Sequence, residues 1–318
     1  MSAQQATHAT LDVFSKQRWV TFQGNPVAVV TINNDCQLSH DQKQRIAKEF
    51  NYTETVYLYA RGENPRVEIF TPIDEMAFAG HPIIGTGHLL FQGSAADPAT
   101  QVSNLTITTK AGPVALAYDR ANLLVHATVP QNFHVHQQEA TLDQIRAVQA
   151  GMDAASDLFA VKHTHPVVSM VSGVTYALVD LTRRHDIFAG IVPGASPTLN
   201  LDEGWSPSFT GVMYYRLLDS HLEAASGMMH WNLRVRMVAI NLEDPACGSG
   251  GCSLSSYLAL SKGDQSRKHR FNISQGSEMG RDSQIVVDVY LDEEGRQLSQ
   301  LRLAGQATVV TEGRIFLS

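Results

Sequence analysis

The chain has 318 residues, of which 43% are apolar and 17% are charged, and its formal net charge at pH 7 is −7. This composition allows a packed core in two domains of ordinary size or in one large domain. The negative charge, without a block of lysines and arginines, argues against nucleic acid and anionic membrane surfaces as partners. The longest apolar stretches have the length of strands, so the sequence predicts no membrane-spanning segment.

The N-terminal segment and the cysteines indicate the compartment. MSAQQATHATLDVF lacks a basic region followed by an apolar region, so we expect no secretory signal. The three cysteines, Cys36, Cys247 and Cys252, cannot form a complete set of disulfides. A reducing, cytoplasmic compartment is therefore the simplest interpretation.

Short β-rich segments recur through the first half, and two helical patterns interrupt them. The predicted strands are NPVAVVT, TVYLYA, VEIFT, LTITT, PVALAY and NLLVHATV. A helix is predicted in SHDQKQRIAKEF, where Ser39 is a candidate N-cap and Ile46, Ala47 and Phe50 share one face. A second, glycine-containing helix is predicted in HPIIGTGHLLF.

The second half repeats this style after a polar segment at 130–140 that is a candidate linker. A helix is predicted in TLDQIRAVQAG, with Thr141 as the N-cap and Gly151 as the C-terminal stop. The strands that follow are predicted in PVVSMV, TYALVDL, FTGVMYYRLL, LRVRMVAI, QIVVDVYL and ATVVTEGRIFL. Residues 193–207 are rich in Pro, Gly, Ser and Asp and predict a surface loop.

A weak internal repeat relates the two halves. EMAFAGHPIIGTGHLL (75–90) aligns with EDPACGSGGCSLSSYL (243–258) at a shift of 168 residues. The matched pairs are Glu75 with Glu243, Ala79 with Cys247, Gly80 with Gly248, and Leu90 with Leu258. Each segment follows a predicted strand and enters an apolar helix, which favours two similar α/β domains facing each other. A glycine-rich sequence also gives such a match by chance.

Both segments predict a strand–glycine turn–helix unit, which presents free backbone N–H groups at the positive end of the helix dipole. Such a turn binds a phosphate, a carboxylate or a developing enolate. The phosphate-binding P-loop motif is excluded because neither turn has its lysine, and Glu243 and Asp244 would repel a triphosphate. The dinucleotide fingerprint is unmet because GSGG lacks its spacing.

The histidines and cysteines admit other chemistry. HVH (His134, His136) and HTH (His163, His165) could each place two ligands on one strand face, but neither has the pattern of a known zinc helix, and surface histidines are favoured. Cys247 is either a thiolate stabilised at a helix start or a small buried residue. Cys252 is predicted to lie in the core.

Five stretches resemble the PhzF-like (phenazine biosynthesis) isomerase family: FQGNPVAVV, NYTETVYLY, VEIFTPIDEMAFAGHPIIGTGHLL, RVRMVAINLEDPACGSGGCSLSSYL, and the C-terminal QGSEMGRDSQIVVDVYL with AGQATVVTEGRIFLS. The resemblance implies an α+β fold of two pseudo-symmetric, diaminopimelate-epimerase-like domains, each a β-sheet or barrel wrapped around a central helix, with the active site in the cleft between them. We expect one domain at 1–130, completed by a strand at 305–318, and the other at 131–304.

The resemblance also implies a set of site residues. The acid-base glutamate falls on Glu54 in TETV, where Thr53 replaces the usual serine, and the intact AGHP and EDP…GS motifs carry over His81 and Asp244 as catalytic residues. The implied substrate-binding residues are Gly80, Gly248, Ser249, Gly250 and, with a less direct match, Asn25.

This chain departs from the family pattern at the second turn. Cys247 stands where members often have threonine, and Gly250 and Gly251 stand where they often have two alanines. Racemases of this fold use one cysteine in each half. Since the repeat pairs Cys247 with Ala79, a two-cysteine racemase is disfavoured, although Cys247 could be an accessory acid opposite Glu54.

The implied function is an isomerase in which Glu54 moves a carbon-bound proton of a small carboxylic acid, while His81 and Asp244 orient the substrate or relay the proton. The resemblance implies no organic cofactor, no metal and an association as a homodimer. Two alternatives stay open: an epimerase or dehydratase with Cys247 as the acid, and a non-catalytic small-molecule binding or scaffold protein.

Overall fold

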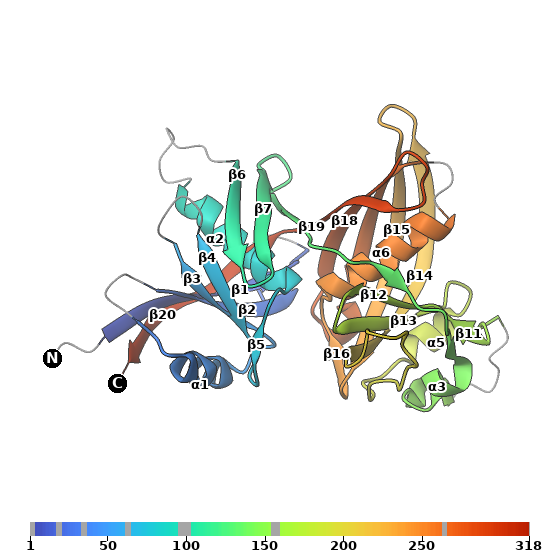
Figure 1. Cartoon of the computed structure of the whole chain (residues 1–318), viewed down its shortest axis with the longest axis horizontal. Helices are drawn as coiled ribbons and strands as arrows, with labels where there is room; N and C mark the ends of the chain where they lie inside the picture. Colours follow the sequence, from blue (N-terminus) through green and yellow to red (C-terminus); the bar gives the residue numbers. More distant parts are fainter. Residues whose placement is uncertain are drawn as a thin grey trace. The chain divides into compact units, whose positions relative to one another are not determined.

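The chain divides into two compact units, each with a mixed sheet and one long helix (Figure 1). Unit 1 comprises Met1–Val129 and Ala304–Ser318, and unit 2 comprises Pro130–Leu303. The computed structural model describes residues 4–16, 21–32, 37–60, 65–94, 103–153, 160–262 and 266–317. None of the helices in these ranges is long and apolar enough to span a membrane.

Unit 1 is built on one sheet that both ends of the chain enter. Its elements are β1 (Gln4–Val13), β2 (Asn25–Thr31), α1 (His40–Phe50), β3 (Thr55–Tyr59), β4 (Arg66–Phe70), β5 (Glu75–Met76), α2 (Gly80–Ser94), β6 (Asn104–Thr109), β7 (Gly112–Asp119), β8 (Leu124–Thr128) and β20 (Ala307–Leu317). β1 lies antiparallel between β2 and β20. β2 pairs with β3 in parallel, β3 pairs with β4 antiparallel, and β4 pairs antiparallel with β5 and in parallel with β6.

Helices cover both faces of the unit 1 sheet. A Cβ atom placed at Gly85 of α2 would come within 3.1 Å of Val27, so α2 packs closely on one face. Val30, whose side chain points to the opposite face, belongs to the apolar cluster that contains Ala47 of α1. Because successive strand residues point to opposite faces, a strand covered on both sides is apolar throughout, as the central PVAVV of β2 is.

The start of α1 follows the sequence prediction. Ser39 is the N-cap: its hydroxyl accepts the N–H of Gln42, and the Gln42 side chain accepts the N–H of Ser39. This reciprocal pair is a capping box, which satisfies two of the N–H groups that a helix start leaves without partners. The helix ends at Asn51, which has the left-handed backbone conformation with φ of 52°.

A tight backbone approach fixes the entry into β2. Gly24 has φ of +72°, and a Cβ atom there would overlap the carbonyl oxygen of Val13. We expect Gly24→Ala to destabilise the protein by more than the roughly 1–2 kcal/mol that the left-handed conformation alone costs. Urea unfolding measures this loss. The control is Gly112→Ala, because Gly112 also has positive φ (+112°) but open space around its Cβ position; equal losses would contradict the steric explanation.

Unit 2 repeats the strand connections of unit 1 within a longer chain segment. Its elements are β9 (His134–Val135), β10 (Ala140–Thr141), α3 (Leu142–Arg146), α4 (Ala150–Asp153), β11 (Thr164–His165), β12 (Val167–Val171), β13 (Val174–Asp180), α5 (His185–Ala189), β14 (Phe209–Glu223), β15 (Met228–Ala239), β16 (Leu242–Asp244), α6 (Gly248–Lys262), β17 (Lys268–Gln275), the 3-10 helix η1 (Ser277–Met279), β18 (Ser283–Leu291) and β19 (Leu298–Gly305). β13 pairs with β14 in parallel, β14 with β15 antiparallel, and β15 antiparallel with β16 and in parallel with β17. The same pairings, in the same orientations, connect β2, β3, β4, β5 and β6 in unit 1.

The predicted strand–turn–helix repeat is present in the structure. Helices α2 and α6 each have 15 residues, and both their first and last residues are separated by the predicted 168 positions (248 − 80 and 262 − 94). Each follows a short strand, β5 or β16, that folds back on the strand before it. The two turns singled out in the sequence therefore occupy the same place in each unit.

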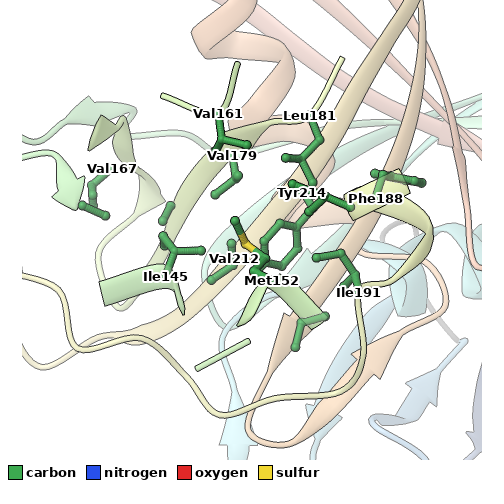
Figure 2. Packing of buried hydrophobic residues seen from close by; sticks show 14 residues of the cluster. Ile145, Met152, Val161, Val167, Val179, Leu181, Phe188, Ile191, Val212 and Tyr214 are labelled. Atoms are coloured by element: carbon green, nitrogen blue, oxygen red, sulfur yellow. The ribbon is translucent and has the colours of Figure 1, made fainter. Parts of the chain in front are cut away.

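The core on one face of the unit 2 sheet is shown in Figure 2. Val212 and Tyr214 of β14 pack there against Ile145 of α3, Met152 of α4 and Phe188 of α5. α6 packs against β12, β13, β17 and β18. Unit 2 thus has its own buried apolar cluster beside its long helix.

The predicted helix at 141–151 is correct at its start and wrong at its end. Thr141 is the N-cap of α3, with a capping box to Gln144, but α3 ends at Arg146. The reason is the buried side chain of Gln149, which accepts the N–H groups of Gly151 and Val192 and donates to the carbonyl of Val192. These bonds hold the chain in a loop, and Gly151 lies in α4 instead of ending a helix.

Candidate active site

Unit 1 brings Glu54 and His81 together. Glu54 directly precedes β3, and His81 is the second residue of α2. Oε2 of Glu54 lies 3.3 Å from Nε2 of His81, and the two side chains are 16% and 7% exposed. The pair is therefore a carboxyl and an imidazole in contact, almost removed from water.

Burial changes the acidity of Glu54. Removal from water raises the pKa of Glu54 to about 7, against the opposing effect of a hydrogen bond with the Thr53 side chain. For a carboxyl with this pKa, both the protonated and the ionised form are populated near neutral pH. Such a group can accept a proton from one atom and return it to another, which is the property required of an acid-base catalyst.

His81 belongs to the first turn of α2. Gly80 is the first residue of the helix, and Pro82 at the third position has no N–H to satisfy. The helix dipole places partial positive charge at this end, next to the Glu54 contact of His81. Asn25 is the first residue of β2, pairs with Val13, and is buried.

In unit 2, two side chains shape the turn that leads into α6. The Oδ1 atom of Asp244 accepts the N–H of Ala246 at 2.8 Å. The buried amide of Gln275 donates from Nε2 to the carbonyl of Asp244 at 2.7 Å and accepts the N–H of Cys247 at 3.3 Å. One carboxyl oxygen of Asp244 therefore maintains the turn, and Gln275, which no sequence motif singles out, holds it from β17.

Cys247 is the residue directly before α6, and its thiol is buried. The N–H of Gly250 donates to Sγ at 3.3 Å, as a backbone donor does to an N-cap side chain. Burial, with a smaller contribution from the charge of Asp244, raises the pKa of Cys247 to about 12. At neutral pH the group is a thiol, so the interpretation as a stabilised thiolate is wrong. Cys252 is buried as predicted, and Cys36 lies outside the described residues.

The glycines of this turn fit their neighbours. A Cβ atom at Gly250 would overlap the sulfur of Met213 and reach 3.0 Å from Sγ of Cys247. Glycine at position 250 is thus matched to Met213 and Cys247. This explains one departure of the chain from the family pattern.

Tyr176 of β13 contacts both functional groups at the start of α6. Its hydroxyl lies 2.7 Å from Oγ of Ser249 and 3.4 Å from Sγ of Cys247. The sequence does not distinguish this residue, because TYALVDL has the pattern of an ordinary core strand. The alternation of the strand places the tyrosine ring on one face, but no sequence signal identified α6 as the neighbour of that face.

The predicted site residues fall into two groups. Glu54, His81, Gly80 and Asn25 belong to unit 1, and Asp244, Cys247, Gly248, Ser249 and Gly250 belong to unit 2. Within unit 1 the structure brings Glu54 to His81. Within unit 2 it brings Ser249 to Cys247, with 3.7 Å between Oγ and Sγ.

Within the described ranges, one group of three residues could hold a metal ion: His134, His136 and Asp202, whose donor atoms lie within 4.8 Å of one another. Nε2 of His134 contacts Oδ2 of Asp202 at 2.7 Å. Nδ1 of His136 accepts the N–H of Asp202 at 3.1 Å, and its Nε2 contacts Oγ of Ser169 at 2.9 Å. Since both nitrogens of His136 already have hydrogen-bond partners, the cluster is satisfied as an internal network.

The expectation that the paired histidines lie on the surface is wrong for one member of each pair. His136 and His165 are buried. Burial lowers the pKa of His136, and it lowers the pKa of His165 to about 4. These histidines are neutral side chains of the interior at physiological pH.

Comparison with known proteins identifies relatives over the whole length. A family model described as phenazine biosynthesis-like protein, PhzC-PhzF, matches residues 11–313. An uncharacterized isomerase from Mesorhizobium japonicum is 28% identical over 96% of this chain and 97% of its own length. A trans-2,3-dihydro-3-hydroxyanthranilate isomerase from Pseudomonas aeruginosa is 26% identical over 98% and 99%, respectively. A PhzF-family phenazine biosynthesis protein from Bacillus anthracis covers 99% of this chain and 100% of its own, with a TM-score of 0.72 and 19% identity.

The fold defines the class first: an α+β protein of the epimerase-like kind, with a mixed sheet and one long helix in each unit, as the sequence predicted. The family follows from the model that spans most of the chain. The protein belongs to the phenazine biosynthesis-like, or PhzF, family, whose relatives named above include isomerases, and the predicted membership is confirmed.

Proposed function

We propose that the protein is an isomerase that moves a carbon-bound proton of a small carboxylic acid, with Glu54 as the acid-base group. The contact of Glu54 with His81 in a nearly dry environment is the observation that carries the proposal. Glu54 removes the proton as a carboxylate and returns it as a carboxylic acid. His81 holds the carboxyl in position and accepts or donates the hydrogen bond that each state requires.

The start of α6 supplies the donors for the carboxylate of the substrate. The backbone N–H groups of Gly248 and Ser249 donate to no other residue in the described part of the chain. Together with the Ser249 hydroxyl they form a set of neutral donors at the positive end of a helix, which favours an anion. Asp244 supports this role by shaping the turn.

In the proposed reaction Glu54 and His81 carry the proton with neither a metal nor an organic cofactor.

The relative from Pseudomonas aeruginosa suggests the substrate class. Its name describes a cyclic amino acid with a carboxylate on a partly unsaturated ring. We propose a substrate of the same class, in which removal of a ring proton gives an anion that conjugation delocalises. The test is incorporation of solvent deuterium into a panel of cyclic and acyclic amino and hydroxy acids. Exchange in one of them supports the isomerase, whereas exchange in none favours a protein that only binds its ligand.

Cys247 is the remaining alternative as the acid. A thiol with a pKa of about 12 is a weak donor, so we expect Cys247→Ala to keep kcat within about tenfold of the wild type, well short of the loss that removal of a general acid causes. Initial rates of proton exchange measure this. Cys252→Ala, at the other buried cysteine of unit 2, is the matched control. A decrease in kcat of roughly a hundredfold or more in Cys247→Ala alone would make the thiol the acid.

A further inference from the structure

We propose that Tyr176 is a positioning residue that directs the hydroxyl of Ser249 outward as a donor to an anionic ligand. The inference rests on the proposed function, because that function assigns the carboxylate of the substrate to the start of α6. It adds a residue that neither the motifs nor the family resemblance selected. It also specifies which way a chain of hydrogen bonds runs.

The contacts form a continuous chain from the backbone to the surface. The N–H of Gly250 donates to Sγ of Cys247 at 3.3 Å, Sγ lies 3.4 Å from the Tyr176 hydroxyl, and this hydroxyl lies 2.7 Å from Oγ of Ser249. Tyr176 and Cys247 are buried, whereas Ser249 is partly exposed. The exposed end of the chain is therefore the serine hydroxyl.

Only the first bond has a fixed direction: a backbone N–H can only donate, so Sγ of Cys247 is the acceptor there. In each of the next two contacts either atom can be the donor. The order that we propose is the one in which Cys247 donates to Tyr176 and Tyr176 donates to Oγ of Ser249. The Ser249 hydroxyl has received one hydrogen bond and keeps its proton for a group outside the chain, where an anion gains most from the aligned dipoles.

The side chains in this run of hydrogen bonds stay neutral, which suits the binding of an anion better than the removal of a proton. Burial raises the pKa values of both Tyr176 and Cys247. At the matching position of the repeat, 168 residues earlier, α2 carries His81 in contact with Glu54. Unit 1 thus has a carboxyl whose pKa is raised to about 7, and unit 2 has a set of donors that stays neutral.

The experiment compares Tyr176→Phe with Tyr214→Phe, using benzoate as the carboxylate probe in calorimetric titrations. Tyr214 is a fully buried tyrosine of the same unit whose ring lies in the core cluster of Figure 2. We expect Tyr176→Phe to raise the Kd about tenfold, equally at pH 6 and pH 8, and Tyr214→Phe to change it by less than about twofold. Equal Kd values in the wild type and Tyr176→Phe would overturn the proposal, as would no binding of benzoate to the wild type.

A double-mutant cycle separates positioning from mere packing. If Tyr176 acts through Ser249, benzoate should bind Tyr176→Phe/Ser249→Ala no more weakly than Ser249→Ala alone. Additive losses would show that Tyr176 acts independently of the serine and would overturn the proposal. Benzoate binding requires no proton transfer, so failure here leaves the role of Glu54 untouched, and failure of deuterium exchange leaves this result interpretable.

Discussion

Glu54→Gln should lower the rate of proton exchange by a factor on the order of 100 to 10,000, the usual contribution of a general acid-base group. Glutamine keeps the size and the hydrogen-bonding capacity of the side chain but cannot take up or release the proton. The measurement is deuterium incorporation into the substrate that the panel identifies. Benzoate affinity should stay near the wild-type value, since the start of α6 is unchanged.

Glu49→Gln is the matched control, because Glu49 is an exposed glutamate on α1 of the same unit. This variant should exchange protons at the wild-type rate. A Glu54→Gln protein that folds and retains full exchange would remove Glu54 as the base and with it the proposed mechanism.

Glu54→Gln should also remove a pH dependence of the unfolding free energy that the wild type has. The pKa of Glu54 is raised by burial to about 7 from 4.5, so the folded wild type binds this proton more tightly than the unfolded chain does. Its contribution to stability is complete below pH 4.5, falls as pH rises toward 7, and is lost above 7. Relative to Glu54→Gln, the wild type should lose on the order of 3 kcal/mol of unfolding free energy between pH 4.5 and 8. Parallel urea curves at several pH values would contradict this.

Arg236→Leu should be the most destabilising of the substitutions considered for unit 2. The side chains of Arg236 and Glu243 are each 5% exposed and form a two-point ion pair, with 2.7 Å from Nε to Oε1 and 2.6 Å from Nη2 to Oε2. Nη1 also donates to the carbonyls of Phe188 and Ala189, at the end of α5. Removal of the guanidinium leaves a buried carboxylate without its partner, which typically costs about 3–5 kcal/mol. Urea unfolding monitored by fluorescence measures the loss.

The double variant Arg236→Leu/Glu243→Leu is the control for this pair. With both charges removed, no buried carboxylate is left, so the double variant should be more stable than Arg236→Leu alone. If Arg236→Leu costs less than about 1 kcal/mol, the value of a solvent-exposed pair, the pair does not hold β15, β16 and α5 together as its geometry indicates.

The sequence predicted the fold well where the pattern was local or repeated. Ser39 and Thr141 are predictable as N-caps because a hydroxyl side chain at the start of a helical pattern is a local signal. The start of α6 was located through its match to the start of α2, and the resemblance to a family supplied Glu54 and His81 as site residues. The structure places these two side chains in contact.

The remaining features depend on contacts between distant segments, which one sequence does not reveal. Gln149 ends a helix through bonds to Val192, 43 positions away. Tyr176 reaches Ser249 across 73 positions, and in the sequence it resembles any aromatic residue of a core strand. The buried His136 likewise has its hydrogen-bond partners, Ser169 and Asp202, far away in the sequence.

The pairing of β20 with β1 has a consequence for synthesis on the ribosome. β1 is translated before every residue of unit 2, yet its partner on one side is β20, which is translated after every residue of unit 2. Unit 2 can therefore finish folding while unit 1 still lacks an edge of its sheet. Until β20 arrives, nascent β1 exposes unpaired backbone groups, so this interval is when the growing polypeptide has most need of a chaperone.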